Sequence, residues 1–96
     1  MLSKKQDELF SKFYGSTIHS EHLDDRTAIL IGLAASMAVA CYPCMKYYLK
    51  EAKEIGIKKE EIGEVLAKVM AVSAGRVNVQ LEDVMADSFG YTEDGS

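Results

Sequence analysis

The chain has 96 residues, and its 11 Lys and Arg against 15 Asp and Glu give a net charge of −4. This length predicts one domain spanning residues 1–96, and 48% hydrophobic residues exclude wholesale disorder. No run of Lys and Arg alternates with aromatic residues, so we expect no nucleic-acid partner. The longest apolar run, residues 28–41, is shorter than the roughly 20 residues that a bilayer requires, so we expect no membrane partner.

The first residues lack the hydrophobic segment of a secretory signal, which predicts a cytoplasmic protein. Two cysteines in such a reducing compartment point to redox or metal chemistry rather than to a structural disulfide.

The first two predicted helices cover residues 3–14 and about 25–40. The first is amphipathic, since its apolar side chains recur at helical spacing on one face: Leu9, Phe10, Phe13 and Tyr14. Asp24 or Asp25 is suited to cap the second, whose apolar residues lie nearly all round and predict a central element.

Three more helical segments are expected, over about 42–55, 59–75 and 79–87, with Gly56 as a left-handed stop after the first of them. The polar tail, residues 88–96, is expected to fray. No segment shows the alternation of a strand, so the predicted fold is all-α.

The most informative motif is Cys41-Tyr42-Pro43-Cys44 at the start of a predicted helix. Spacing of i and i+3 brings two sulfurs to one face of the helix, close enough for a disulfide. The positive end of the helix dipole favours a thiolate, which predicts redox function. The alternative is that both cysteines are small buried apolar residues.

A zinc site is a further alternative. His19 and His22 form an HxxH pair that, with Cys41 and Cys44, would make a tetrahedral ligand set. Most of the segment between the two pairs is predicted as a rigid helix, which would carry them to opposite ends.

Together these features resemble the carboxymuconolactone decarboxylase / alkylhydroperoxidase D-like (AhpD-like) superfamily over a core of about residues 23–75. The segment Leu23-Asp24-Asp25-Arg26-Thr27 is similar to its "LDxKT" helix opening, and a helix of small residues leads into the CxxC. After the CxxC, Ala52, Gly56 and the Glu60-Glu61-Ile62 run match the family pattern.

The resemblance implies an AhpD-like helical bundle of about five or six helices with the CxxC at a helix N-terminus. It also implies a homo-oligomer (dimer, trimer or hexamer) and no bound cofactor, with an external thiol reductant restoring the dithiol.

The proton relay of the peroxidase relatives is missing from this sequence. Its Glu, twelve residues before the first cysteine, is replaced by Ile29, and its His, four residues after the second, by Tyr48. Neither can act as a base near neutral pH. In these relatives the second cysteine, matching Cys44, attacks, whereas the helix-start argument favours Cys41; the order stays open.

Five residues are candidates to replace the relay, each with a simpler structural reading. Tyr48 lies one turn from Cys44 but is more simply a core aromatic, and Glu51 lies on the same side of the helix but is more often solvated. Glu21, His22 and Asp25 would have to approach in space, and junction or capping roles are the simpler reading for each.

The sequence therefore predicts a thiol–disulfide oxidoreductase that reduces a disulfide, or more weakly a peroxide, through Cys41 and Cys44. Its expected partners are that substrate and a reductant protein or small thiol. The alternatives are a non-catalytic oligomeric AhpD-like protein and a Cys/His zinc-binding protein. Carboxymuconolactone decarboxylation is poorly supported, since those enzymes do not rely on a CxxC.

Overall fold

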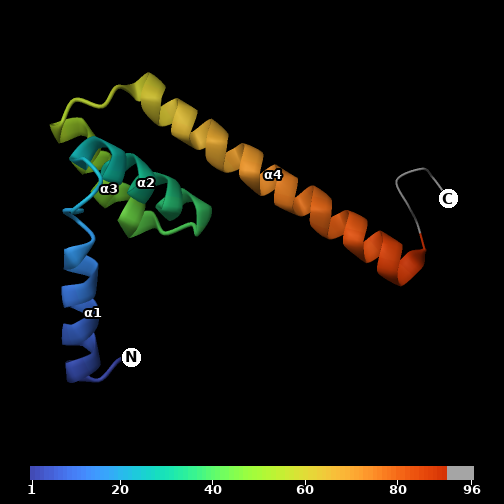
Figure 1. The fold of residues 1–96 in the computed structure, drawn as a ribbon, viewed down its shortest axis with the longest axis horizontal. Helices are drawn as coiled ribbons and strands as arrows, with labels where there is room; N and C mark the ends of the chain where they lie inside the picture. The colour runs from blue at the N-terminus through green and yellow to red at the C-terminus, as the bar shows by residue number, and fades with distance from the viewer. Residues whose placement is uncertain (91–96) are drawn as a thin grey trace. The chain divides into compact units, whose positions relative to one another are not determined.

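The structure, a computed structural model, describes residues 1–90. These residues form four helices and no strand, and Figure 1 labels each helix. The helices are α1 (Lys4–Ser16), α2 (Asp25–Ala38), α3 (Tyr42–Glu54) and α4 (Lys59–Phe89). The all-α prediction is confirmed, while the described residues hold fewer helices than the five or six expected.

The difference in helix count lies in α4. Two segments expected as separate helices, 59–75 and 79–87, form one helix of 31 residues. Gly75 weakens a helix but keeps its backbone N–H, and each added residue of a growing helix gains a hydrogen bond. Helix α4 includes Ser88 and Phe89, the first two residues of the tail that is expected to fray. Residues 91–96 of that tail lie outside the described part of the chain.

The chain divides into two units, Met1–Lys58 and Lys59–Ser96. Within the first unit, α2 and α3 pack against each other as a hairpin. Leu33 and Ala52 are fully buried there, and Ile57, just after α3, is nearly so. The hydroxyl of buried Ser36 donates to the carbonyl of Leu33 at 2.7 Å, so this polar group is satisfied within its own helix.

A glycine sets how closely the two hairpin helices approach. A Cβ atom built at Gly32 of α2 would overlap the ring of Tyr48 of α3. The ring therefore occupies space that any other residue at position 32 would fill, and the small residues predicted for α2 serve this close packing.

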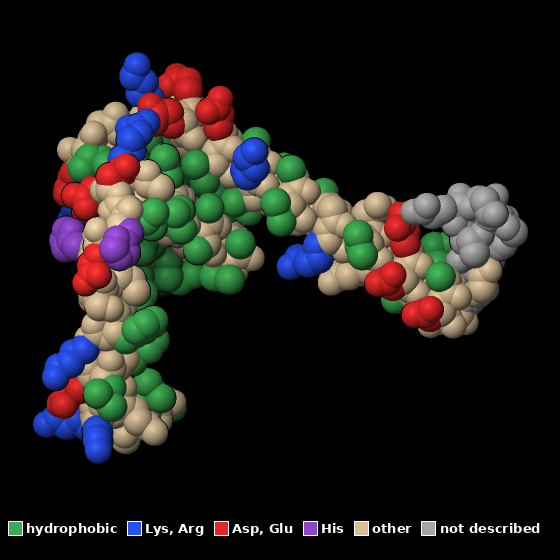
Figure 2. Space-filling model, viewed as in Figure 1, with side chains coloured by type: hydrophobic (Ala, Val, Ile, Leu, Met, Phe, Trp, Pro, Cys, Tyr) green, Lys and Arg blue, Asp and Glu red, His purple; other side chains and the backbone are tan. Residues whose placement is uncertain are grey.

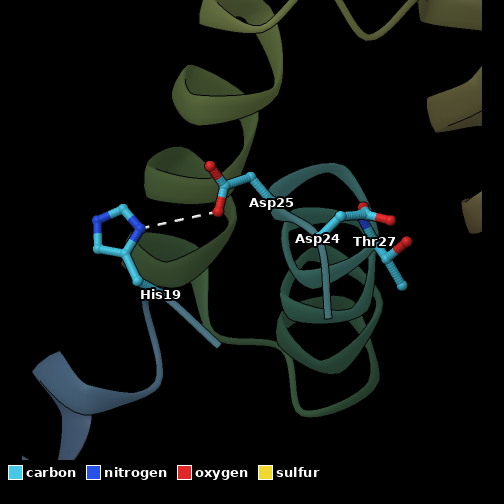
Figure 3. A network of polar contacts seen from close by, with 4 residues as sticks. All are labelled: His19, Asp24, Asp25 and Thr27. Atoms are coloured by element: carbon cyan, nitrogen blue, oxygen red, sulfur yellow. Dashed lines mark hydrogen bonds and ion pairs between the residues drawn. The ribbon is translucent and has the colours of Figure 1, made fainter. Parts of the chain in front are cut away.

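Local caps define the ends of the hairpin helices. The Asp24 carboxylate accepts from the backbone N–H of Thr27 at 2.7 Å, which confirms the expected cap of α2 (Figure 3). Helix α2 ends at Ala38, two residues earlier than expected, because Ala40 turns into the left-handed region with φ 56°. Gly56 has φ 80° and ends α3, as predicted.

Helix α1 begins with a capping box between Ser3 and Gln6, and none of its residues is buried. Its predicted apolar face is open to solvent, with Phe13 65% exposed, and Figure 2 shows hydrophobic side chains on the surface of this helix. In the described residues, no helix is both long enough and apolar enough to cross a bilayer.

Candidate functional site

The two cysteines meet at the start of α3. Cys41 and Cys44 form a disulfide, with 5.2 Å between their Cα atoms, and both side chains are half-buried. This agrees with the prediction that i and i+3 spacing at a helix start brings the sulfurs together. The pair is neither splayed apart nor sealed in the core of the described chain.

Backbone geometry places Cys41 as the N-cap residue of α3. The left-handed turn at Ala40 lets the Cys41 N–H donate to the Ser36 carbonyl at 2.9 Å. The Cys41 carbonyl then accepts from the N–H of Met45 at 2.9 Å, which closes the first turn of the helix. The sulfur of Cys41 therefore stands at the position from which a capping oxygen usually acts.

The first turn of α3 differs from most helix starts in which backbone N–H groups can donate a hydrogen bond. No side chain caps this helix start, and the second helical residue, Pro43, has no N–H. An acceptor at residue 41 would thus receive its hydrogen bond from the backbone N–H of Cys44. Both that N–H and the helix dipole would stabilise a thiolate at residue 41 in the reduced protein.

The two positions of the missing relay converge on one small cavity in the first unit. Ile29 and Tyr48 both line this cavity, whose volume is about 70 Å³. The complete lining is Thr17, Ile18, His19, Asp25, Ala28, Ile29, Tyr47, Tyr48, Glu51 and Ile55. The cavity therefore lies between three parts of the chain: the later turns of α3, the start of α2 and the segment after α1.

The two phenols of the cavity are held in their protonated form. Burial raises the pKa of Tyr48, and the neighbouring Tyr14 hydroxyl raises it further. Burial also raises the pKa of Tyr47, with the Glu51 carboxylate adding to the effect. Both hydroxyls are therefore available as hydrogen-bond donors near neutral pH, and neither is a base there.

Three of the five candidate relay residues reach the cavity. Tyr48, Glu51 and Asp25 line it, whereas Glu21 and His22 do not. These two lie 3.8 Å apart, from His22 Nε2 to Glu21 Oε2, and both side chains are more than 90% exposed. Their pairing in solvent agrees with the simpler reading of junction residues.

His19 is the cavity residue that sequence reasoning considered only as a metal ligand. Its Nδ1 lies 3.8 Å from the carboxylate of Asp25, the first residue of α2, as Figure 3 shows. No spacing in the sequence ties His19 to Tyr48 or Glu51. Only the fold brings the segment after α1 beside the end of α3.

The four proposed zinc ligands are not brought together. His19 and His22 precede α2, while Cys41 and Cys44 follow it, and a helix of 14 residues is about 21 Å long. Across residues 1–90, no group of three or more His, Cys, Asp or Glu side chains is placed to hold a metal ion.

Fold and site together define a small all-helical protein with a CxxC disulfide at a helix N-terminus. The model of the carboxymuconolactone decarboxylase family matches residues 7–84, so the chain belongs to this family. It is also similar to a crystal structure of a protein from Methanobacterium thermoautotrophicum, with 28% identity and a TM-score of 0.77. That match covers 86% of this chain and 95% of the other, and the predicted AhpD-like superfamily is confirmed. A comparison with curated proteins finds no match.

Proposed function

We propose that this protein is a thiol–disulfide oxidoreductase whose reactive groups are the thiols of Cys41 and Cys44. The observation that carries the proposal is the disulfide between them, half-buried at the uncapped start of α3. The preferred substrate is a disulfide, and peroxide reduction is a weaker activity. Membership in a family that includes enzymes supports a catalytic role.

The proposed cycle starts from the dithiol. One thiolate attacks a sulfur of the substrate disulfide, forms a mixed disulfide and releases the first substrate thiolate, which takes a proton from solvent. The second cysteine, as its thiolate, then attacks the mixed disulfide and releases the other substrate thiol. This yields the Cys41–Cys44 disulfide, and an external dithiol or two monothiols return two electrons and two protons. No resident cofactor is required.

We assign the attacking role to Cys41. As the N-cap residue it lies at the positive end of the α3 dipole, where the Cys44 N–H can donate to its thiolate. Cys44 then acts as the resolving thiol. The order seen in peroxidase relatives depends on a proton relay next to the second cysteine, and Ile29 and Tyr48 do not supply one.

Tyr48 and Glu51, which lie about one and two helical turns beyond Cys44 on α3 and line the cavity, are proposed as auxiliary residues. The protonated Tyr48 hydroxyl can donate a hydrogen bond, and the Glu51 carboxylate can accept a proton through water. Tyr48→Phe and Glu51→Gln keep the shape of each side chain and remove this chemistry. We expect each to change the pH profile of turnover while leaving α2–α3 packing intact.

The proposed setting is the cytoplasm, where a reductant protein or small thiol keeps the pair cycling. We also propose that the protein works as a homo-oligomer and has neither a nucleic-acid nor a membrane partner. The low number of buried residues in the described chain supports self-association.

The decisive experiment measures disulfide and peroxide reduction side by side for the wild type, Cys41→Ser and Cys44→Ser. Both variants should lose turnover. Cys44→Ser, which keeps the attacking thiol, should trap the substrate in a mixed disulfide, whereas Cys41→Ser should not. Trapping by Cys41→Ser alone would reverse the assigned order.

The same experiment separates the enzyme from a non-catalytic oligomeric protein. A catalytic dithiol should react rapidly with an alkylating reagent in the native reduced state, with a pH midpoint below about 8.5 for Cys41. Thiols that label only after unfolding, together with turnover unaffected by either substitution, would refute the oxidoreductase proposal.

A further inference from the structure

The cysteine pair lies at the tip of the α2–α3 hairpin, next to exposed apolar residues. Val39 and Tyr42 are 75% and 70% exposed, and Ala40 and Pro43 are exposed as well. Each of these four residues adjoins one of the two half-buried cysteines in sequence or follows its neighbour, and we call the four the apolar rim. Figure 2 shows hydrophobic side chains on the surface of the hairpin. Clustered exposed apolar residues mark an interaction site more often than scattered ones do.

Exposed apolar surface continues from the rim along α2. Ile31, which is 52% exposed, and the exposed Ala35 and Ala38 follow one another at spacings of four and three residues. These spacings place the three residues on one face of the helix, over a length of about 10 Å. An extended polypeptide covers that length with three or four residues. A small disulfide compound covers only the surface next to the sulfurs.

Disulfide exchange requires a polypeptide substrate to contact the rim. When a substrate cysteine joins Cys41 in a mixed disulfide, the two Cα atoms lie about 5.5 Å apart. The Cα atoms before and after that substrate cysteine are each about 3.8 Å further along its chain. The substrate residues that flank the cysteine therefore lie within reach of Val39, Ala40 and Tyr42, and the chemistry of the rim selects among substrates.

The charges around the motif are few and positive. Within residues 27–50 the only charged residues are Lys46 and Lys50. The carboxylates of the first unit belong to α1, to the segment before α2 and its first residue, or to α3 from Glu51 onward, about 10 Å beyond the second cysteine. Lys46 is exposed and lies one turn after Tyr42 on the same side of α3. This flank of the rim therefore attracts an acidic group of a substrate and repels a basic one.

We propose that the dithiol of Cys41 and Cys44 reduces a disulfide in a polypeptide whose cysteine is flanked by apolar residues, with an acidic rather than a basic residue nearby. The inference rests on the proposed oxidoreductase function and names its substrate class. Val39 and Tyr42 are the specificity-determining residues, since they are the large side chains of the rim and lie on either side of Cys41. Glutathione disulfide has no apolar side chain and leaves the rim in water.

The electrons and protons balance as in the proposed cycle. The dithiol gives up two electrons and two protons and becomes the Cys41–Cys44 disulfide, while the substrate disulfide takes them up and becomes two thiols. The test follows one such turnover, with full-length protein that has been reduced and then freed of reductant.

The substrates for this test are short peptides whose single cysteine is joined by a disulfide to thionitrobenzoate, so that every peptide releases the same chromophore. The cysteine is flanked by valines in one peptide and by serines in the other. The second-order rate constant of release should be about tenfold larger for the valine peptide. The mixed disulfide of glutathione and thionitrobenzoate should react about as slowly as the serine peptide. Equal rate constants for the two peptides overturn the inference.

Substitutions locate the source of the preference. Val39→Ser/Tyr42→Ser should bring the ratio of the two rate constants to about one, and Tyr42→Phe should keep it. Phe13→Ser is the matched control, because Phe13 of α1 is an apolar residue with 65% exposure outside the rim. A ratio that the double substitution leaves unchanged, or that Phe13→Ser lowers as much, contradicts the assignment of the rim.

A charge exchange tests the flank at Lys46. Valine peptides with one added Glu or one added Lys should differ about two- to fivefold in rate constant at low salt, in favour of Glu. Lys46→Glu should reverse this order, and added salt should reduce the difference in both proteins. An order that Lys46→Glu leaves unchanged refutes the predicted acidic neighbour.

Failure of the inference and failure of the proposed function give different results. Release at one rate from all peptides, lost in Cys41→Ser, leaves the oxidoreductase standing and overturns the substrate class. If the reduced wild type releases the chromophore from none of them, both proposals are overturned.

Discussion

The α2–α3 hairpin and helix α4 contain similar apolar residues, but the hairpin buries its central ones whereas α4 leaves many of its own exposed. In the hairpin, small residues such as Gly32 and Ala52 let two helices approach until Leu33 is fully buried. In α4, Leu66 and Leu81 are 45% and 57% exposed despite equally regular spacing. An apolar stripe therefore predicts that a helix packs against something, but the steric fit and the length of the helix decide what covers it.

The sharpest contrast is between a leucine of the hairpin core and a leucine of α4. Leu33→Ala should lower the free energy of unfolding by about 2–5 kcal/mol, because it leaves a cavity in a closed core. Leu66→Ala, from a side chain that is 45% exposed, should lower it by about 1 kcal/mol or less at low protein concentration. Urea unfolding followed by circular dichroism measures both.

The destabilisation by Leu66→Ala should also be measured at several protein concentrations. If the loss from Leu66→Ala grows as the concentration rises, the stripe of α4 is buried by association. Equal losses at both leucines in dilute protein would break the contrast between the two regions.

Two helical glycines give a second comparison. Gly32→Ala should destabilise the protein by about 1–3 kcal/mol, since its Cβ would overlap the Tyr48 ring. Gly63 of α4 has open space around it, so Gly63→Ala should stabilise the helix by about 0.5–1 kcal/mol. The two variants should therefore shift the urea midpoint in opposite directions.

A double substitution identifies the cause of the Gly32 effect. Tyr48→Leu removes the ring that the new Cβ would meet, so Gly32→Ala should cost less in this background than in the wild type. An unchanged cost would mean that the clash with Tyr48 is not the reason.

The smallest expected effect concerns the start of α2. The hydrogen bond from the Thr27 N–H holds the pKa of Asp24 below its usual value, so the folded state favours the charged carboxylate. This contribution is fully present above the pKa of the unfolded state, about 3.9, and is lost as the pH falls through the lower pKa of the folded state. Asp24→Ala should lower the melting temperature by a few degrees at neutral pH.

Asp24→Asn is the matched variant, because Asn caps a helix about as well as Asp but does not titrate. The difference in melting temperature between the wild type and Asp24→Ala should shrink on acidification. The difference in melting temperature between Asp24→Asn and Asp24→Ala should persist. If the wild type melts above Asp24→Ala by the same number of degrees down to about pH 2, the role assigned to the carboxylate is contradicted.

Much of the candidate site could be predicted from local sequence. The CxxC spacing predicted that the sulfurs meet, and Pro43 and the residues after it predicted a helix start at the motif. These features depend on neighbours within one turn, where backbone geometry fixes the outcome. The loss of the relay at Ile29 and Tyr48 was also visible in the sequence.

The cavity lined by Ile29 and Tyr48 was not predictable in this way. His19 lines it together with Tyr48 and Glu51, although His19 and Tyr48 are 29 positions apart in the sequence. Glu21 and His22, equally good candidates by residue type, lie in solvent instead. The path of the segment after α1 past the end of α3 decides which of His19, Glu21 and His22 line the cavity.

The sequence by itself determined the all-α class, the family, the Asp24 cap, the Gly56 stop and the disulfide-forming motif. Each follows from residue type and short spacing, which act through a single turn or a single helix. Only the tertiary structure decided that Tyr48 packs on Gly32, that the relay positions share a cavity with His19, and that α4 runs unbroken through Gly75. Packing between helices depends on the fit of distant surfaces, and the length of a helix depends on competition among many weak preferences.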